Sequence, residues 1–119
     1  MSQTIVPVKS TIGLEDLEKV DIRVGTILLV EDVPKSDKLV RLTVDFAVFQ
    51  RKILSGMKKE RANPAEIQGL QALFVVNLQP RKIMGEISEG MIFDIGSSDG
   101  IIPVLAIPEK QVPDGVRAG

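Results

Sequence analysis

Apolar and polar positions alternate with the period of β-strands along much of this chain. Residues 20–24 and 40–46 alternate cleanly, which predicts strands with one face in a core and the other in solvent. Residues 26–30 and the second half of 70–76 are apolar on both faces, which predicts burial on both sides. Gly25 lies between the two halves of the long first strand, so we expect a bulge or sharp bend there.

Three further segments have strand-like patterns. Residues 50–54 are the expected hairpin partner of residues 40–46, and residues 91–95 form another apolar run. Residues 101–105 form the third. Because Pro103 has no amide hydrogen to donate to a neighbouring strand, this last strand is expected at a sheet edge or with a bulge.

Helix signals are few. Residues 13–18 predict a short helical turn, whose acidic residues near its start suit the helix dipole. One capped helix is expected after the third strand, because Asn63 can cap it, Pro64 suits its first position and Gly69 can end it. Three strands, a helix and two more strands are the order of the OB-fold, a five-stranded Greek-key barrel whose loops and one face bind oligonucleotides or oligosaccharides. We therefore expect an all-β fold with one short helix and a C-terminal extension.

Length and composition fit a single globular domain of 119 residues, with 44% hydrophobic and 26% charged residues. We expect residues 1–12 to form a flexible leader and residues 13–119 to form the domain. No apolar run approaches the roughly 20 residues of a membrane helix, and the N-terminus lacks the pattern of a signal peptide. These features favour a cytoplasmic protein without a membrane partner.

The chain contains neither cysteine nor histidine. Disulfides, thiolate nucleophiles, the usual general base near neutral pH and nearly all zinc and iron sites are therefore excluded. The acidic residues show no paired or metal-loop spacing. We expect no enzyme, no catalytic residues, no metal site and no cofactor.

The net charge of −1 is unevenly distributed along the sequence. Residues 49–85 carry 7 basic and 2 acidic residues, whereas the segments on either side are net negative. A positive segment of this kind can attract phosphates, since an anionic partner meets the local patch and not the total charge. A block in the sequence need not form a patch on the surface, so charge alone leaves both interpretations open.

Residues 77–91 carry the strongest functional signal and are expected to form a loop between two apolar strands. Pro80 restricts the backbone beside Arg81 and Lys82, two adjacent basic residues that can reach phosphates. Asn77 and Ser88 add polar groups that can position a ligand. A solvated basic turn next to a core methionine would contain similar residues, so the segment on its own is modestly specific.

Four segments together resemble the signatures of the tRNA-binding domain family. They are Val20 to Gly25, Ser36 to Leu39, Ser55 to Met57 and Asn77 to Met91, in this order. The family includes the C-terminal domain of many bacterial methionyl-tRNA synthetases, free-standing structure-specific tRNA-binding proteins and the CsaA-type chaperones linked to protein export. The resemblance covers roughly residue 13 to the C-terminus.

The resemblance implies an OB barrel that binds the folded L shape of tRNA without catalysis, commonly as a homodimer, and that serves as an auxiliary to a methionyl-tRNA synthetase chain. Ser55 lies in a matching motif, although it can equally be the residue that ends the third strand. The remaining matched positions divide into a tRNA-binding face, formed by Asn77, Arg81, Lys82, Ser88 and Met91, and residues that hold the loop geometry, namely Gly85, Glu89 and Gly90.

The C-terminal residues 107–116 are similar to those of the CsaA-type branch, for which the implied function is peptide binding. Residues 77–82 and 88–91 look closer to the tRNA-binding branch, and the two functions are not mutually exclusive. A structural subunit of a synthetase complex is a third alternative. The chain has no Trp or Tyr and only four Phe, so base stacking on exposed rings is not expected, and recognition through phosphates, sugars and shape fits better.

Overall fold

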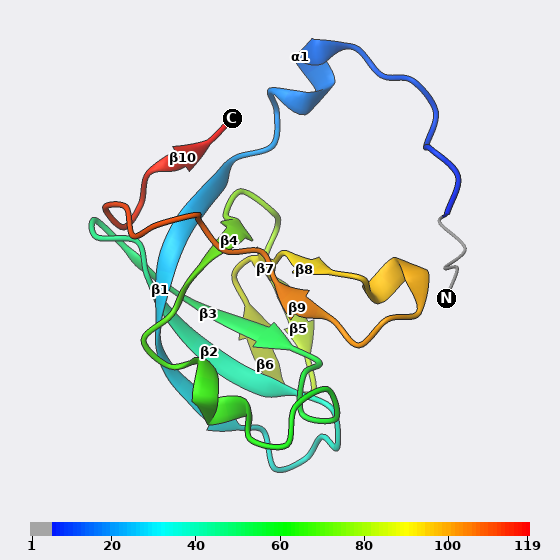
Figure 1. Cartoon of the computed structure of the whole chain (residues 1–119). Helices are drawn as coiled ribbons and strands as arrows, with labels where there is room; N and C mark the ends of the chain where they lie inside the picture. Colours follow the sequence, from blue (N-terminus) through cyan, green and yellow to red (C-terminus); the bar gives the residue numbers. More distant parts are fainter. Residues whose placement is uncertain (1–5) are drawn as a thin grey trace.

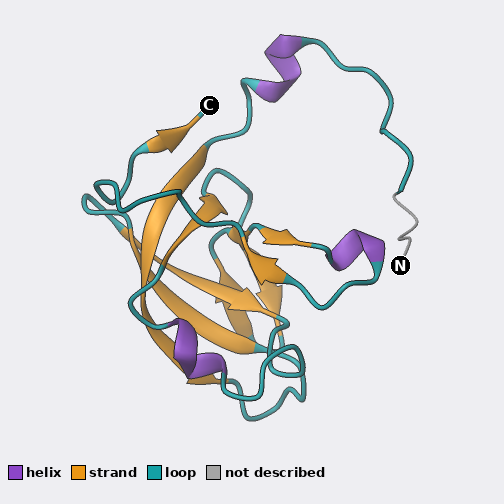
Figure 2. Cartoon of the chain, viewed as in Figure 1, coloured by secondary structure: helices purple, strands orange, loops and turns teal. Residues whose placement is uncertain are grey.

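Ten short or medium strands, one α-helix and two 3₁₀ helices form the regular structure of residues 6–119, the part of the chain described by this computed structural model (Figures 1 and 2). The helical elements are α1 (Leu14–Leu17), η1 (Pro64–Ile67) and η2 (Ser97–Asp99). The strands are β1 (Ile22–Asp32), β2 (Val40–Asp45), β3 (Gln50–Ser55), β4 (Gln71–Val75), β5 (Arg81–Ile83), β6 (Glu86–Ser88), β7 (Met91–Ile92), β8 (Asp94–Ile95), β9 (Val104–Leu105) and β10 (Arg117–Ala118).

The main sheet is antiparallel and has the strand order β3-β2-β1-β4-β7, with β10 added to β1. The long strand β1 pairs with β4 through its first half and with β2 through its second half, so it curves around the molecule (Figure 1). Residues 88 and 89 then meet β3 and bring the two ends of the sheet together. The expected OB-type barrel is confirmed.

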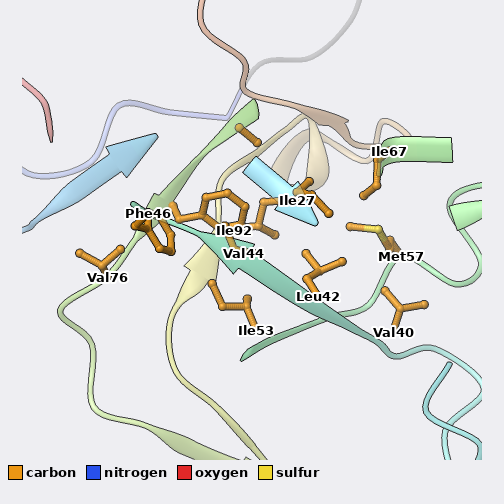
Figure 3. Packing of buried hydrophobic residues seen from close by; sticks show 12 residues of the cluster. Ile27, Val40, Leu42, Val44, Phe46, Ile53, Met57, Ile67, Val76 and Ile92 are labelled. Atoms are coloured by element: carbon orange, nitrogen blue, oxygen red, sulfur yellow. The ribbon is translucent and has the colours of Figure 1, made fainter. Parts of the chain in front are cut away.

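The core is filled by the side chains that alternate inward along the strands. Leu42 and Val44 of β2 and Ile53 of β3 have no exposed surface, while Arg41 and Asp45 lie on the other face of β2. Each large apolar side chain that is fully buried contributes about 1.5–3 kcal/mol relative to its exposed state. The cluster, drawn as sticks in Figure 3, contains Ile27, Val40, Leu42, Val44, Phe46, Ile53, Met57, Ile67, Ala72, Phe74, Val76 and Ile92.

The bulge expected at Gly25 lies elsewhere in β1. The register shift in β1 lies at Leu28, between Ile27 and Leu29, and Gly25 pairs regularly with Ala72. Gly25 is required for packing instead, because a Cβ atom there would lie 2.6 Å from Val44 Cγ1 and would also meet the Phe46 ring. The bulge exposes Leu28 and Leu29 on the outside of the barrel.

The helix expected after the third strand is present as η1, between β3 and β4. It is a 3₁₀ helix of four residues and not an α-helix. The Asn63 side chain caps it by accepting a hydrogen bond from the Ala65 amide at 3.3 Å, and Pro64 is its first residue. The predicted start is therefore confirmed, while Gly69 lies two residues beyond its end with φ +90.

The last two expected strands, residues 91–95 and 101–105, contain less strand than the pattern predicts. Residues 91–95 are broken at Phe93 into β7 and β8, and within residues 101–105 only β9 is a strand. β9 pairs with β8 in a separate two-stranded sheet. Of the expected leader, residues 1–5 lie outside the described residues, and residues 6–13 have no regular secondary structure.

Candidate nucleic-acid interface

The segment expected as a loop over residues 77–91 is largely a β-hairpin, so that expectation is wrong. β5 and β6 pair in the register Arg81 to Ser88, Lys82 to Ile87 and Ile83 to Glu86. The two residues between the strands are Met84 with φ +52 and Gly85 with φ +81. Positive φ at both central residues is characteristic of the type I′ turn, which suits the twist of a hairpin.

Ser88 and Glu89 join this hairpin to β3. The Ser88 hydroxyl is buried, accepts a hydrogen bond from the Leu54 amide at 3.0 Å and donates one to the Gly90 carbonyl at 3.2 Å. The Glu89 carboxylate accepts from the Lys52 amide at 2.9 Å, and the Glu89 amide donates to the Lys52 carbonyl at 2.8 Å. Where the barrel closes, these two side chains therefore accept hydrogen bonds from β3 amides that a neighbouring strand would otherwise accept through its backbone carbonyls.

Gly90 follows this junction and allows close packing against β4. A Cβ atom on Gly90 would lie 2.8 Å from the Val75 carbonyl oxygen, and Ile53 would be 3.3 Å away on the other side. Pro80, which precedes β5, is exposed. The geometry of the hairpin thus depends on the turn at Met84 and Gly85 and on the junction with β3.

Arg81 and Lys82 lie on opposite faces of the hairpin, because successive side chains of a strand point in opposite directions. Arg81 shares a face with Ile83 and Ser88, and all three line a small pocket of about 80 Å³. Lys82 is paired with Ile87 on the other face. The two cations that are adjacent in the sequence can therefore reach the same ligand only if it wraps around the hairpin.

The small pocket brings together several of the predicted residues. Arg81, Ser88, Gly90 and Met91 line it, and Met91 is 44% exposed. A second cleft of about 310 Å³ also borders Met91, and Ser55 lines it. Leu54 and Met91 line both depressions, so the two are neighbours, and together they are called the concave surface beside Met91. The second cleft also contains Phe93, Asp94 and Ser97, which the sequence did not single out.

Asn77 has a clear structural contact within the protein. Its Oδ1 accepts a hydrogen bond from the Asp21 amide at 2.8 Å, and its Nδ2 donates to the Lys19 carbonyl at 2.7 Å. The side chain thereby fixes the chain before β1 against the end of β4. Asn77 lines neither depression beside Met91. Its contact with RNA stays a prediction.

The positive middle segment divides into paired and unpaired cations. Lys58 is ion-paired with Asp32, Lys59 with Asp37 at 3.5 Å and Arg61 with Glu66 at 3.0 Å. Within residues 6–119, the other basic residues of the segment form no ion pair with an acidic side chain; they are Arg51, Lys52, Arg81 and Lys82. Within this segment, the cations without an ion pair therefore lie on β3 and the hairpin.

Arg41 supports the hairpin from the outer face of β2. Its guanidinium donates to Glu31 of β1 at 3.2 Å and also to Glu86 of β6. The hydrogen bond from Arg41 is the main reason why the pKa of Glu31 lies below its usual value. The sequence could have placed Glu31 and Arg41 on one outer face, but the contact with Glu86 depends on how the hairpin folds over the sheet.

No group of three or more acidic side chains within residues 6–119 is arranged to hold a metal ion. The helices of the same region are all too short or too polar to span a membrane.

Comparison with known proteins identifies the family. Residues 22–117 match the family model described as "Putative tRNA binding domain". Methionine--tRNA ligase of Parabacteroides distasonis is 42% identical over 109 residues, as is that of Archaeoglobus fulgidus, and in each case the match covers 92% of this chain and 16% of the relative. The chain therefore corresponds to about one sixth of the length of these ligases.

Solved structures support the same assignment. A MetRS-related protein from Pyrococcus horikoshii has a TM-score of 0.85 and 31% identity, and the match covers 93% of this chain and all of that protein. The chaperone CsaA from Bacillus anthracis has a TM-score of 0.77 and 27% identity, with 92% of this chain and all of that protein covered. The matched region contains the barrel, the hairpin and both depressions beside Met91, and the chain belongs to the tRNA-binding domain family.

Proposed function

We propose that this chain is a non-catalytic protein that binds folded tRNA through the RNA backbone and shape. The observation that carries the proposal is Arg81, which forms no ion pair in the described residues and lines the small pocket beside Met91, within the region that matches the tRNA-binding domain. A guanidinium can hold phosphate oxygens in a bidentate manner, which fixes the position of an RNA without reading its sequence.

Recognition of shape fits the positions of the aromatic rings. Phe46 and Phe74 are fully buried and pack edge to face, with ring centroids 5.5 Å apart. Phe49 stacks on Phe46 and also carries the Arg51 guanidinium over its ring, 4.9 Å from the centroid. The fourth ring, Phe93, is half-buried beside the larger cleft, so the described residues have no row of exposed rings of the kind on which single-strand binding proteins stack successive bases.

A homodimer is part of the proposal. The C-terminal extension exposes large apolar side chains beyond the barrel, with Ile102 71% and Ile107 62% exposed. In Figure 1, α1 lies away from the barrel, and its Leu14 and Leu17 are 70% and 56% exposed. Apolar surface of this extent favours association, and a second copy can cover it symmetrically.

We also propose that the chain acts beside a methionyl-tRNA synthetase, as an auxiliary that adds affinity for tRNA. Support comes from the ligases to which it is similar, since the chain corresponds to a small part of their length. A module that holds the same tRNA raises the effective concentration of the substrate at the enzyme. The catalytic work would then belong to the synthetase chain.

The alternative function is peptide binding, as in a CsaA-type chaperone, and it is supported by the similarity to the CsaA structure. Arg81 favours the RNA, because an unpaired guanidinium on a concave surface is better matched to phosphate than to an extended apolar peptide.

A gel-shift comparison tests the proposed function. The wild-type protein is titrated into folded tRNA and into a single-stranded RNA of equal length, at several salt concentrations. We expect preference for the folded tRNA and a linear fall of log affinity with log salt. Equal affinity for the two RNAs would contradict recognition of shape. Suppression of client aggregation without tRNA binding would favour the peptide function, and binding only after addition of a synthetase would indicate a structural subunit.

A further inference from the structure

The larger depression beside Met91 has the size and chemistry of a site for one ring system. Its volume of about 310 Å³ is at the lower end of the range for small-ligand sites, about 300–1,000 Å³. Met91 and Phe93 provide an apolar and aromatic surface, while Ser55, Asp94 and Ser97 provide polar groups. A flat, partly polar group that stacks on one side and forms hydrogen bonds along one edge fits this arrangement.

The polar groups of this cleft have no partners within the protein. In residues 6–119 the side chains of Ser55, Asp94 and Ser97 form no hydrogen bond or ion pair. Asp94 is exposed, and its carboxylate acts on Glu60, whose pKa is raised mainly by burial and secondly by the negative charge of Asp94. The cleft is therefore a negative region, in contrast to the pocket beside Arg81.

This difference in charge orients an RNA on the concave surface. A phosphate is attracted to Arg81 and repelled by Asp94, whereas the N–H groups of a base are attracted to a carboxylate, which is an acceptor only. Leu54 and Met91 line both depressions, so a nucleotide that lies across these two residues would have Arg81 on its phosphate side and Asp94 on its base side.

The arrangement of hydrogen-bond donors distinguishes the bases. Guanine alone presents two adjacent donors, N1–H and the N2 amino group, on its Watson–Crick edge. Adenine and cytosine each place a ring acceptor next to their amino group, and uracil has one donor between two carbonyl groups. The two oxygens of one carboxylate match the guanine edge, and unpaired bases in RNA are commonly read through this edge while they stack on a side chain.

We propose that the cleft binds the base of an unpaired guanine in the RNA, with the Asp94 carboxylate accepting hydrogen bonds from guanine N1–H and N2–H. The base lies against Met91 and Phe93, and the Ser55 and Ser97 hydroxyls are available to its other polar atoms. This proposal rests on the proposed function and adds a base-specific contact to recognition of shape.

The first test uses mononucleotides and the methyl signals of methionine in NMR spectra. GMP should shift the Met91 signal, while the buried Met57 serves as an internal reference because it is only 3% exposed. IMP lacks the N2 amino group, and AMP lacks both donors in this arrangement. We expect each to bind about tenfold more weakly than GMP, within the range of one bidentate base contact. Equal shifts with all three nucleotides would overturn the proposal.

Asp94→Asn is the decisive variant, because the two roles of this carboxylate predict opposite results. If Asp94 accepts hydrogen bonds from guanine, Asp94→Asn loses the preference for GMP and binds folded tRNA about tenfold more weakly. If Asp94 only repels phosphate, the variant binds tRNA as well as the wild type or more tightly, which overturns the proposal. Glu60→Gln is the matched control, since it removes a neighbouring charge outside the cleft, and it should retain the preference for GMP.

Gly56→Leu tests the cleft by steric exclusion. Gly56 lines the cleft, and a Cβ atom there meets no atom within 4 Å, so we expect the fold to tolerate the substitution and the longer side chain to occupy space beside the cleft. The shifts that nucleotides cause in the Met91 methyl signal should disappear in this variant.

A peptide that contains arginine tests the alternative ligand. If this peptide shifts the Met91 signal of the wild type and not that of Asp94→Asn, while GMP causes no shift, the cleft is a peptide site and the proposal is wrong. If the wild type binds no tRNA at all, the proposed function itself fails, whatever the result with GMP.

Discussion

Glu89 and Lys52 exchange two hydrogen bonds where the barrel closes. The Glu89 carboxylate accepts from the Lys52 amide at 2.9 Å, and the Lys52 carbonyl accepts from the Glu89 amide at 2.8 Å. Glu89 thus continues the hydrogen bonding to β3 by one residue beyond the end of β6. Because the junction also holds the hairpin against β3, the position of Arg81 depends on it.

Glu89→Ala should destabilise the protein by about 1–2 kcal/mol, because the Lys52 amide loses a charged acceptor at a partly exposed site. Chemical denaturation monitored by circular dichroism measures the change. Glu109→Ala is the control, since Glu109 is exposed and lies outside the barrel junction, and it should change the free energy of unfolding by less than about 0.5 kcal/mol. Equal stability of the two variants would show that the barrel closes without the Glu89 side chain.

Met84→Asn should stabilise the β5–β6 hairpin by about 0.5–1 kcal/mol. Met84 has φ +52, a conformation that is costly for most residues and better tolerated by Asn, and Asn-Gly is a preferred pair for a type I′ turn. Thermal unfolding measures the expected increase in melting temperature. Met84→Leu keeps the unfavourable φ and provides the comparison. If Asn and Leu give the same melting temperature, the turn in solution is not type I′.

Acid should weaken the attachment of β10 to β1 through Asp21. The hydrogen bonds from Arg23 are the largest cause of the lowered pKa of Asp21, and Arg117 of β10 adds a further hydrogen bond at 3.2 Å. Because the folded-state pKa lies below the ordinary pKa of 3.8 for an aspartate, the stabilisation is present above that value and is lost as the pH falls through the folded-state pKa.

Unfolding free energies measured from about pH 6 down to about pH 2 check this effect. The wild type should lose more stability than Asp21→Asn over the acidic part of the range, because the variant has no proton to gain at this site. Parallel curves for the two proteins would mean that Asp21 has the same pKa in the folded and unfolded states.

The homodimer can be tested by light scattering at micromolar concentration. Ile102→Glu should shift the protein toward the monomer, because it places a charge on the exposed apolar extension. Val48→Glu is the control, since Val48 is 86% exposed in the turn between β2 and β3, outside the extension. A wild-type protein that is already a monomer would contradict the dimer proposal.

The barrel could be predicted from the sequence because its strands have regular patterns and its turn residues are informative. The alternation in residues 40–46 identifies β2, and Asn63-Pro64 locates η1. The sequence does not predict the hairpin, because β5 and β6 contain three residues each, too few for a clear period, and because Met84 gives no turn signal. The position of the bulge depends on how β1 pairs with two partners, which no local pattern reveals.

The candidate site could be predicted only in part, because it also depends on contacts between segments that are distant in the sequence. Arg81, Ser88 and Met91 do meet around one pocket. Their neighbours Asp94 and Ser97 come from β8 and η2, and only the path of the chain after β7 brings them to the same surface as Ser55. The sequence also suggested that Arg81 and Lys82 act together, whereas the hairpin places them on opposite faces.

The proposed binding face is tested most directly by the salt dependence of tRNA binding for Arg81→Ala and Lys82→Ala. Both residues are exposed and unpaired with acidic side chains in the described structure, so each variant should fold and each loses one charge. We expect Arg81→Ala to weaken binding to all tRNAs and to make the slope of log affinity against log salt shallower by about one unit. Lys82→Ala should have a smaller effect. If the two changes together leave both the affinity and the slope at wild-type values in a folded protein, the concave surface beside Met91 is not where this protein binds tRNA.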